Sequence, residues 1–337
     1  GILIGRSHRA EEFVGTRLRD DLWTRMKELP EGIQSAETLD GVQSLQAYQH
    51  SRASGWLVGV SVPESLVTAP WRRTLALFAG GGALLFLIGL GVALLDTGTG
   101  RRFGRRDEAR FPMCSTFKAL LAGAVLHAVD RGRVRLDQRV DIGAEDLVTY
   151  SPYVDTRVAD GHARVDALCR ATVTLSDNAA ANLLLPLVGG PPGLTALLRE
   201  LGDPVTRLDR WEPALNEAAP GDPRDTTSPR AMVDSLQRLL FGTALHPPSQ
   251  AVLAAWLIEN RTGDARIRAG VPADWRVGDK TGTCGAGTAA DVAVLYPPGR
   301  APLLLAIYVH GATLDGPAID ALHADATRLL VAAAARP

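Results

Sequence analysis

The chain has 337 residues, 46% of them hydrophobic, so it is long enough for one large globular domain with an appendage. Its 36 basic and 37 acidic residues nearly cancel, and a net charge of −1 gives no electrostatic reason to expect a nucleic-acid partner. The three cysteines lack metal-ligand spacing, and the seven histidines include no H-E-x-x-H pair. No phosphate-binding or dinucleotide-binding motif occurs, so neither a metal nor a cofactor is predicted.

Residues 1–74 are polar and charged, with a helix-like stretch at 11–29 and a strand-like stretch at 55–62. We treat them as an N-terminal segment of uncertain fold. Residues 75–95 then contain no charged side chain, and this length suffices to span a bilayer. Arginines flank the run on both sides, so the charges predict no orientation.

The end of the apolar run has two interpretations. Residues 91–96 followed by TGTG at 97–100 are typical of a buried strand that enters a turn, with 101–106 as the return strand. Residues 89–95 cannot be helix and strand together, and we favour the strand. An apolar helix is then left at 75–89, which is short for a membrane span and is a candidate membrane anchor.

The rest of the chain shows helical periodicity in its middle and strand-like runs at its end. Helices are predicted at 115–131, 179–188, 193–201, 228–241, 250–260 and 317–335. Strands are predicted at 275–279, 289–296 and 303–310. Strands at both ends of a helical middle predict one sheet built from distant segments, with a helical lobe inserted between them.

Lysine is rare in this chain, and two of the three lysines lie in short motifs. Lys118 ends CSTFK at 114–118, and Lys280 begins KTGTC at 280–284. An ammonium, unlike a guanidinium, can shift its pKa and exchange protons when it is buried. Ser115 begins a predicted helix and Lys118 lies one turn on, so the serine could pass its proton to or through a neutral lysine.

Ser176, Asp177 and Asn178 form a short polar loop before a predicted helix. A hydroxyl in such a loop can relay a proton, and an amide can bind a substrate carbonyl. The structural alternative is a helix cap.

The second lysine motif ends a predicted strand. Lys280 and Thr281 suit an anionic substrate group, and Gly282 allows a ligand to approach the backbone closely. The backbone N–H groups of Ser115 and Thr283 are predicted to form an oxyanion hole.

In this order and spacing, S-x-x-K, S-D-N and K-T-G are the signature of penicillin-recognising serine enzymes. Residues 89–335 resemble a class A β-lactamase, and RWEPALN at 210–216 resembles the omega loop of that family. The resemblance implies an α/β (α+β sandwich) fold, in which an antiparallel five-stranded sheet is flanked by helices and an all-helical lobe is inserted. The β-lactamase domain would occupy 90–335, with a sheet lobe at 90–113 plus 263–335 and a helical lobe at 114–262.

The resemblance also implies catalytic roles. Ser115 would attack the lactam carbonyl, with Lys118 or a Glu212-bound water accepting its proton. Ser176 would pass a proton to the leaving nitrogen. Glu212 would then activate the water that cleaves the acyl-enzyme, and Asn216 would position it.

Binding roles follow from the same resemblance. Arg210 would pair with Asp225 and clamp the omega loop. Tyr150 would form a wall at the cleft entrance, with simple packing as the alternative. The AAD sequence at 289–291 offers no arginine for a substrate carboxylate, which leaves that role to Arg266 and Lys280. The residues predicted to bind substrate are Asn178, Asn216, Lys280, Thr281, Gly282, Thr283, Arg266 and Tyr150.

Cys114 and Cys284 flank the two lysine motifs. In the family that the chain resembles, cysteines at both positions mark the serine carbapenemases and a few relatives, where they form a disulfide. The resemblance therefore implies a disulfide here, with two buried free thiols as the alternative, and residues 266–275 also resemble that branch. A disulfide requires an oxidising compartment such as the periplasm. Cys169 has no visible partner and is predicted to be a core thiol.

The predicted function is hydrolysis of β-lactam antibiotics, namely penicillins, cephalosporins and carbapenems, by a periplasmic monomer. A penicillin-binding transpeptidase or carboxypeptidase would share the three short motifs, but Glu212 favours hydrolysis. A membrane sensor with a lactam-binding domain is the non-enzymatic alternative, because residues 1–88 weakly resemble the outer sensor region and membrane segment of a bacterial receptor. A natural fusion, a misjoined reading frame and an engineered chain all stay open as origins of residues 1–88.

Overall fold

The computed structural model describes residues 14, 16–17, 31–38, 41–50, 57–63 and 89–335. The chain divides into two compact units, residues 1–86 and 87–337, and each is described by itself. Most of the helix expected at 11–29, and residues 75–88 of the apolar run, lie outside the described residues.

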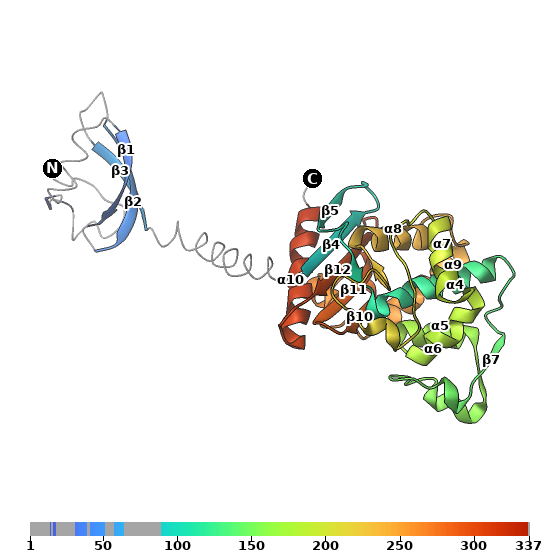
Figure 1. Ribbon diagram of the computed structural model, residues 1–337. Helices are drawn as coiled ribbons and strands as arrows, with labels where there is room; N and C mark the ends of the chain where they lie inside the picture. The colour runs from blue at the N-terminus through green and yellow to red at the C-terminus, as the bar shows by residue number, and fades with distance from the viewer. Residues whose placement is uncertain are drawn as a thin grey trace. The chain divides into compact units, whose positions relative to one another are not determined.

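The first unit contains an antiparallel sheet of order β1-β2-β3 (Figure 1). Its strands are β1 (Glu31–Glu37), β2 (Gln43–His50) and β3 (Leu57–Pro63). At the turn between β1 and β2, Gly41 has a φ of 78°, which glycine adopts without steric cost. β3 confirms the strand expected at 55–62, whereas β1 and β2 were not predicted because their polar residues obscure the strand periodicity.

The second unit is built around an antiparallel five-stranded sheet of order β10-β11-β12-β4-β5 (Figure 1). Its strands are β4 (Gly89–Asp96), β5 (Arg102–Arg105), β10 (Arg276–Cys284), β11 (Thr288–Tyr296) and β12 (Leu303–His310). β4 pairs with β12 so that Asp96 lies opposite Leu303. The prediction of a single sheet drawn from both ends of this part of the chain is confirmed.

β4 also decides between the two interpretations of residues 89–95, and the strand is correct. Every residue from Leu90 to Asp96 is buried. A strand that is covered on both faces carries a continuous apolar sequence, so it can be mistaken for part of a spanning helix. Within the described part of the chain no single helix is long and apolar enough to cross a membrane; only the bent pair at 178–188 and 190–200 passes such a test, by length and composition.

The helices around the sheet agree with the predicted ones to within a few residues. They are α4 (Phe117–Asp130), α6 (Asn178–Leu184), α7 (Gly190–Glu200), α8 (Pro229–Leu240), α9 (Pro247–Glu259) and α10 (Gly316–Ala334). The helix expected from residue 115 differs at its start, where a 3₁₀ turn at Cys114–Thr116 precedes α4. α8 packs on β4 and β12, while α10 lies on the other side of the sheet (Figure 1).

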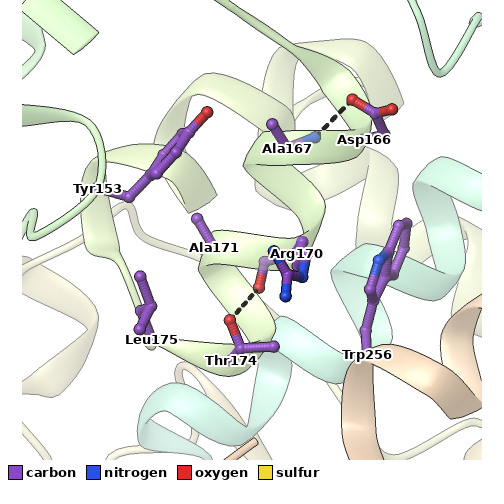
Figure 2. Close-up of a pocket in the computed structure, with 8 residues that line it drawn as sticks. All are labelled: Tyr153, Asp166, Ala167, Arg170, Ala171, Thr174, Leu175 and Trp256. Carbon is purple, nitrogen blue, oxygen red and sulfur yellow. Dashed lines mark hydrogen bonds between the residues drawn. The ribbon is translucent and has the colours of Figure 1, made fainter. Parts of the chain in front are cut away.

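α5 (Val165–Thr174) is a helix that was not predicted. It has only ten residues and ends in three β-branched ones, so its helical periodicity is short and its propensity low. Its outer face carries Ala167 and Arg170 (Figure 2). Its inner face buries Cys169, a free cysteine whose thiol pKa is raised by burial, which confirms the predicted core thiol.

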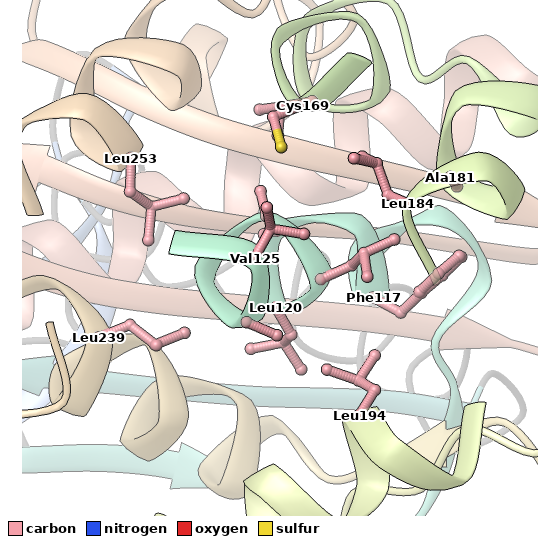
Figure 3. Close-up of a cluster of buried hydrophobic side chains, with 14 of the residues drawn as sticks. Phe117, Leu120, Val125, Cys169, Ala181, Leu184, Leu194, Leu239 and Leu253 are labelled. Atoms are coloured by element: carbon pink, nitrogen blue, oxygen red, sulfur yellow. The ribbon is translucent and has the colours of Figure 1, made fainter. Parts of the chain in front are cut away.

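The core of the helical lobe surrounds α4, in which every residue from Phe117 to Ala128 is buried. Figure 3 shows Leu120 and Val125 of α4 among side chains of the helices α5 to α9. At Gly123 a Cβ would lie 2.7 Å from Leu239 Cδ1, so α4 and α8 approach closely and a larger residue would require the Leu239 side chain to shift. Because packing fixes α4 on all sides, the residues at its start are held rigidly.

Candidate active site

The turn that carries Ser115 is tied to the centre of the sheet. Thr116 Oγ1 donates to Met113 O at 2.7 Å, so it accepts from the Tyr308 hydroxyl at 3.0 Å, because a hydroxyl has one proton to give. Tyr308 belongs to β12 and is fully buried. The fold therefore fixes the position of Ser115 through its neighbour.

Lys118 lies at the centre of the site and is fully buried. Its Nζ lies 3.1 Å from Ser115 Oγ, 2.8 Å from Ser176 O and 2.5 Å from Asn178 Oδ1. It also forms a buried ion pair of 3.1 Å with Glu212 Oε1. Burial lowers the pKa of Lys118, and the Glu212 carboxylate opposes that shift. Since an ammonium has three protons for these four oxygen atoms, Ser115 and Glu212 compete for a proton of Lys118.

Glu212 is held by both its side chain and its backbone. Its Oε2 accepts a hydrogen bond of 2.5 Å from Asn216 Nδ2. Asn182 accepts from Glu212 N at 3.0 Å and donates to Glu212 O at 2.9 Å. Asn182 was not predicted, although it follows Asn178 by one helical turn and so lies on the same face of α6.

The omega loop, residues 210–225, is closed by the predicted pair of Arg210 and Asp225. Arg210 Nε donates to Asp225 Oδ2 at 2.6 Å. The backbone N–H groups of Asp209 and Arg210 both donate to Asp225 Oδ1, at 2.7 and 3.0 Å. One buried carboxylate thus fastens both ends of the loop that carries Glu212.

In the S-D-N motif, Asp177 has a structural role and Ser176 faces the two lysines. Asp177 caps α6 by accepting from Ala180 N at 2.8 Å, so the helix-cap alternative holds for this residue. Ser176 has a φ of 58° and directs its hydroxyl between two amines, 3.0 Å from Lys280 Nζ and 3.5 Å from Lys118 Nζ. A hydroxyl in this position can carry a proton between the two lysines and a bound molecule.

Lys280 lies inside β10, toward the end of the strand where the K-T-G motif was expected. The strand-like run stopped at residue 279, but backbone pairing with β11 continues to Cys284, because polar and glycine residues do not interrupt the hydrogen-bonded ladder. Lys280 Nζ donates to Ser176 Oγ at 3.0 Å and to Thr281 O at 2.8 Å. Burial, together with the charge of Lys118, lowers the pKa of Lys280 to about 7.

Gly282 makes room for the serine turn. A Cβ at this position would lie 2.8 Å from Met113 O and 3.2 Å from Ser115 N. The missing side chain therefore allows the serine turn to approach β10 closely, and the expected contact between a ligand and the Gly282 backbone stays a prediction. Thr283 follows directly in β10, so both segments expected to supply oxyanion-hole N–H groups lie beside this contact.

Arg266 joins the edge of the site to α10. Its Nη1 donates to Gly282 O at 2.9 Å and Ala290 O at 2.8 Å, and its Nη2 donates to Thr283 Oγ1 at 2.9 Å. Asp320 of α10 accepts from Arg266 Nε at 2.7 Å. The guanidinium is therefore fixed, and its charge lies directly behind the Thr283 hydroxyl.

Two buried aspartates lie in the same region. Asp279 accepts from Asn260 Nδ2 at 2.7 Å and pairs with Arg268, while Asp291 accepts from Ile267 N at 3.1 Å. Burial raises the pKa of both carboxyl groups, and for Asp291 the nearby Asp279 raises it further.

Thr262 is a further site residue that the sequence patterns did not indicate. Its hydroxyl donates to Asn260 Oδ1 at 2.9 Å and so accepts from Thr281 Oγ1 at 2.6 Å. No motif surrounds Thr262, and only the fold brings it to β10.

A disulfide between Cys114 and Cys284 confirms the predicted pairing over 170 residues, with the two Cα atoms 5.7 Å apart. It ties the serine turn to the end of β10.

Tyr150 is 59% exposed and has a φ of 66°, and its carbonyl accepts from Asn178 N at 3.0 Å. The exposed Tyr150 side chain therefore belongs to a backbone segment that is hydrogen-bonded to Asn178 of the S-D-N motif.

The sequence model of the Beta-lactamase enzyme family matches residues 88–334. The chain is 50% identical to β-lactamase AST-1 of Nocardia asteroides over 242 residues, which are 72% of this chain and 78% of that protein. It is 48% identical over 266 residues to the carbapenem-hydrolyzing β-lactamase KPC of Klebsiella oxytoca, covering 79% of this chain and 88% of that protein.

A solved structure of the last common ancestor of Gram-negative bacteria β-lactamase class A superposes with a TM-score of 0.74 at 58% identity, covering 77% of this chain and 99% of the other. The predicted fold class is confirmed by this likeness. The chain belongs to the β-lactamase enzyme family, as a class A serine β-lactamase near the carbapenemase branch.

Proposed function

We propose that this protein hydrolyses β-lactam antibiotics through an acyl-enzyme on Ser115. The observation that carries the proposal is the contact of Lys118 Nζ with both Ser115 Oγ and Glu212 Oε1, each at 3.1 Å. A serine beside a buried amine can become a nucleophile, and a buried carboxylate beside the same amine can serve a second, hydrolytic step. A single chain supplies every group, so we propose that the monomer is active.

In acylation, Ser115 Oγ attacks the lactam carbonyl and its proton passes to Lys118 or to a water held by Glu212. The N–H groups of Ser115 and Thr283 stabilise the oxyanion that forms. Ser176 then gives its proton to the leaving nitrogen and regains one from a neighbouring lysine, since its hydroxyl lies 3.0 Å from Lys280 Nζ.

In deacylation, Glu212 takes a proton from a water molecule that attacks the ester carbonyl, and Ser115 leaves as the alcohol. Asn216 orients this water, a role supported by its 2.5 Å hydrogen bond to Glu212 Oε2. The hold of Asn182 on the Glu212 backbone keeps the carboxylate aimed at the ester.

The substrate carboxylate binds to Lys280, Thr281 and Thr283, with Arg266 behind them. The 2.9 Å hydrogen bond from Arg266 to the Thr283 hydroxyl supports this assignment. Asn178 binds the substrate side-chain amide, and Tyr150 packs against the substrate at the entrance. Similarity to the carbapenem-hydrolyzing KPC enzyme supports carbapenems as substrates beside penicillins and cephalosporins.

The disulfide at the site supports an oxidising compartment, so we propose that the catalytic unit works in the periplasm. Protease access from the periplasmic side of fractionated cells would test this assignment.

Nitrocefin turnover tests the proposed activity. The parent protein is expected to cleave many equivalents, whereas Glu212→Gln is expected to stop after about one, with a mass increase on Ser115. A parent that itself stops after one equivalent would indicate a penicillin-binding enzyme. A Glu212→Gln variant that turns over at the parent rate would contradict the role of Glu212. Imipenem that persists as an adduct on the parent would exclude carbapenem hydrolysis.

A further inference from the structure

A surface pocket of about 320 Å³ lies on the helical lobe, outside the catalytic cluster. α5 forms its floor with Ala167 and Ala171, and Tyr153 and Trp256 stand on opposite sides (Figure 2). None of the residues that line it has a role in the proposed hydrolysis. Its volume falls in the range of small-molecule sites in proteins.

The apolar part of the pocket is lined by the two alanines, Leu175 and Trp256. The two alanines leave a shallow floor, because their side chains end at Cβ. Trp256 belongs to the core and is 7% exposed, so its indole is rigidly placed, while Leu175 is 43% exposed at the end of the floor. A flat ring between two aromatic side chains buries apolar surface and gains from ring contacts on either side.

The polar part of the pocket offers donors. Arg170 uses only Nε within the described part of the chain, in a 2.6 Å ion pair with Glu259, and its two terminal nitrogens have no partner there. Figure 2 shows the Arg170 guanidinium between Ala171 and Trp256. The Tyr153 hydroxyl and the Trp256 N–H likewise donate to none of the described residues.

The carboxylates around the pocket, in contrast, are each paired with an arginine. Asp166 binds Arg164 through both oxygens, at 3.0 and 2.6 Å, and the Glu259 carboxylate is paired with Arg170. Unused donors beside carboxylates that are already paired favour an anion, and the planar guanidinium matches a carboxylate.

We propose that this pocket binds an aromatic carboxylate. The ring lies on Ala167 and Ala171 between Tyr153 and Trp256, and the carboxylate pairs with the free edge of Arg170. The site is separate from the catalytic cleft. Leu175 lines the pocket while the next residue, Ser176, faces the lysines, so the two sites lie on opposite sides of one loop.

The test uses 2-naphthoate as the probe and follows backbone amide shifts of residues 166–175 by NMR. Saturable binding is expected in the parent. Arg170→Gln is expected to weaken binding about tenfold, the worth of a charge-assisted hydrogen bond. Glu259→Gln is the matched control, because it breaks the same exposed ion pair but keeps the guanidinium, and it should bind at least as tightly as the parent.

Two further variants keep the outcome decisive. Ala167→Leu fills the floor without changing any charge and should abolish binding. Lys280→Gln removes a cation of the catalytic cleft and should leave binding unchanged. Equal binding by parent and Arg170→Gln, loss of binding in Lys280→Gln, or no saturable shifts in the parent would each overturn the proposal. None of these readouts depends on β-lactam hydrolysis, so the two proposals can fail separately.

Discussion

Lys118 and Lys280 are two fully buried lysines of one site, but their surroundings treat their charge differently. Lys118 belongs to the helical lobe and has a carboxylate, that of Glu212, at 3.1 Å. Lys280 belongs to the sheet, and its hydrogen bonds go to the Ser176 hydroxyl and the Thr281 carbonyl. Burial lowers the pKa of both amines, and for Lys280 the result is about 7.

The difference suggests a division of labour. The charge of Lys118 is balanced within the protein, so this amine is suited to exchange protons with Ser115 and Glu212. Among the residues that the structure describes, no carboxylate forms an ion pair with Lys280, so an anionic substrate can supply that partner. A buried cation without an acid in contact lowers the free energy of unfolding of the free protein, and an anion that binds to the cation raises it again.

Removing Lys118 gives the largest expected effect. Lys118→Ala should lower nitrocefin kcat/KM by about 10³-fold or more, because Ser115 loses the amine in contact with its hydroxyl and Glu212 loses the group that holds it. It should also lower the free energy of unfolding by about 3–5 kcal/mol, because Glu212 loses its buried partner. Adding Glu212→Gln to that variant should restore stability but not activity, as measured by urea unfolding. A single variant as stable as the double one would show that the ion pair does not balance the site.

The disulfide joins the serine turn before Lys118 to the strand that carries Lys280. Breaking it is expected to give the second largest effect. Replacing Cys114 and Cys284 together with alanine should lower the free energy of unfolding by about 2–5 kcal/mol. Cys169→Ala is the control, since it removes a buried sulfur that links nothing. A reducing agent should destabilise the parent and leave the double variant unchanged. If reduction affects both alike, the bond does not hold the two halves of the site together.

The sequence predicted most of this site because its chemistry is concentrated in short motifs. Ser115 and Lys118 are three residues apart, and Lys280 begins a motif of its own, so all three can be recognised from the local sequence without knowledge of the fold. The sheet was predicted from continuous apolar runs such as β12, which are typical of strands buried on both faces.

The residues that were missed act through the fold. Thr262 reaches Thr281 only because a loop after α9 returns beside β10, and no local pattern encodes that approach. Asn182 holds the Glu212 backbone from a helix thirty residues earlier in the chain. The strand-like run at 275–279 is shorter than β10 because K-T-G-T lacks strand periodicity, while the ladder from these residues to β11 supplies the hydrogen bonds.

The pH dependence of Lys280 gives a smaller and more specific effect. Its pKa of about 7 means that it loses charge as the pH rises above neutrality, so nitrocefin kcat/KM should fall there. An ester of the substrate carboxylate should lack this fall, because it has no anion to pair. If free acid and ester show the same profile, Lys280 does not bind the carboxylate.

Protein stability should show the opposite trend. The pKa of Lys280 is about 7 in the folded protein and about 10.4 in an unfolded chain, so the unfolded state binds more protons between these values. The stability of the parent relative to Lys280→Met should therefore rise from pH 7 towards pH 10. Urea unfolding of both proteins at several pH values would measure this difference, and a flat difference would contradict the buried, proton-depleted amine.

The smallest effect is expected from Thr262→Val, which tests the Lys280 half of the site separately from the Lys118 half. Thr262→Val removes the hydroxyl that accepts from Thr281 at 2.6 Å. Thr281 is the neighbour of Lys280 and is expected to bind the carboxylate, whereas the Glu212 contact serves deacylation. Nitrocefin KM should rise about fivefold, the worth of one hydrogen bond, with kcat unchanged, because Thr281 is less well oriented for the carboxylate while deacylation is untouched. Thr174→Val, on the outer face of α5, is the matched control and should change neither constant. A fall in kcat with KM unchanged would place Thr262 with the Lys118 half of the site.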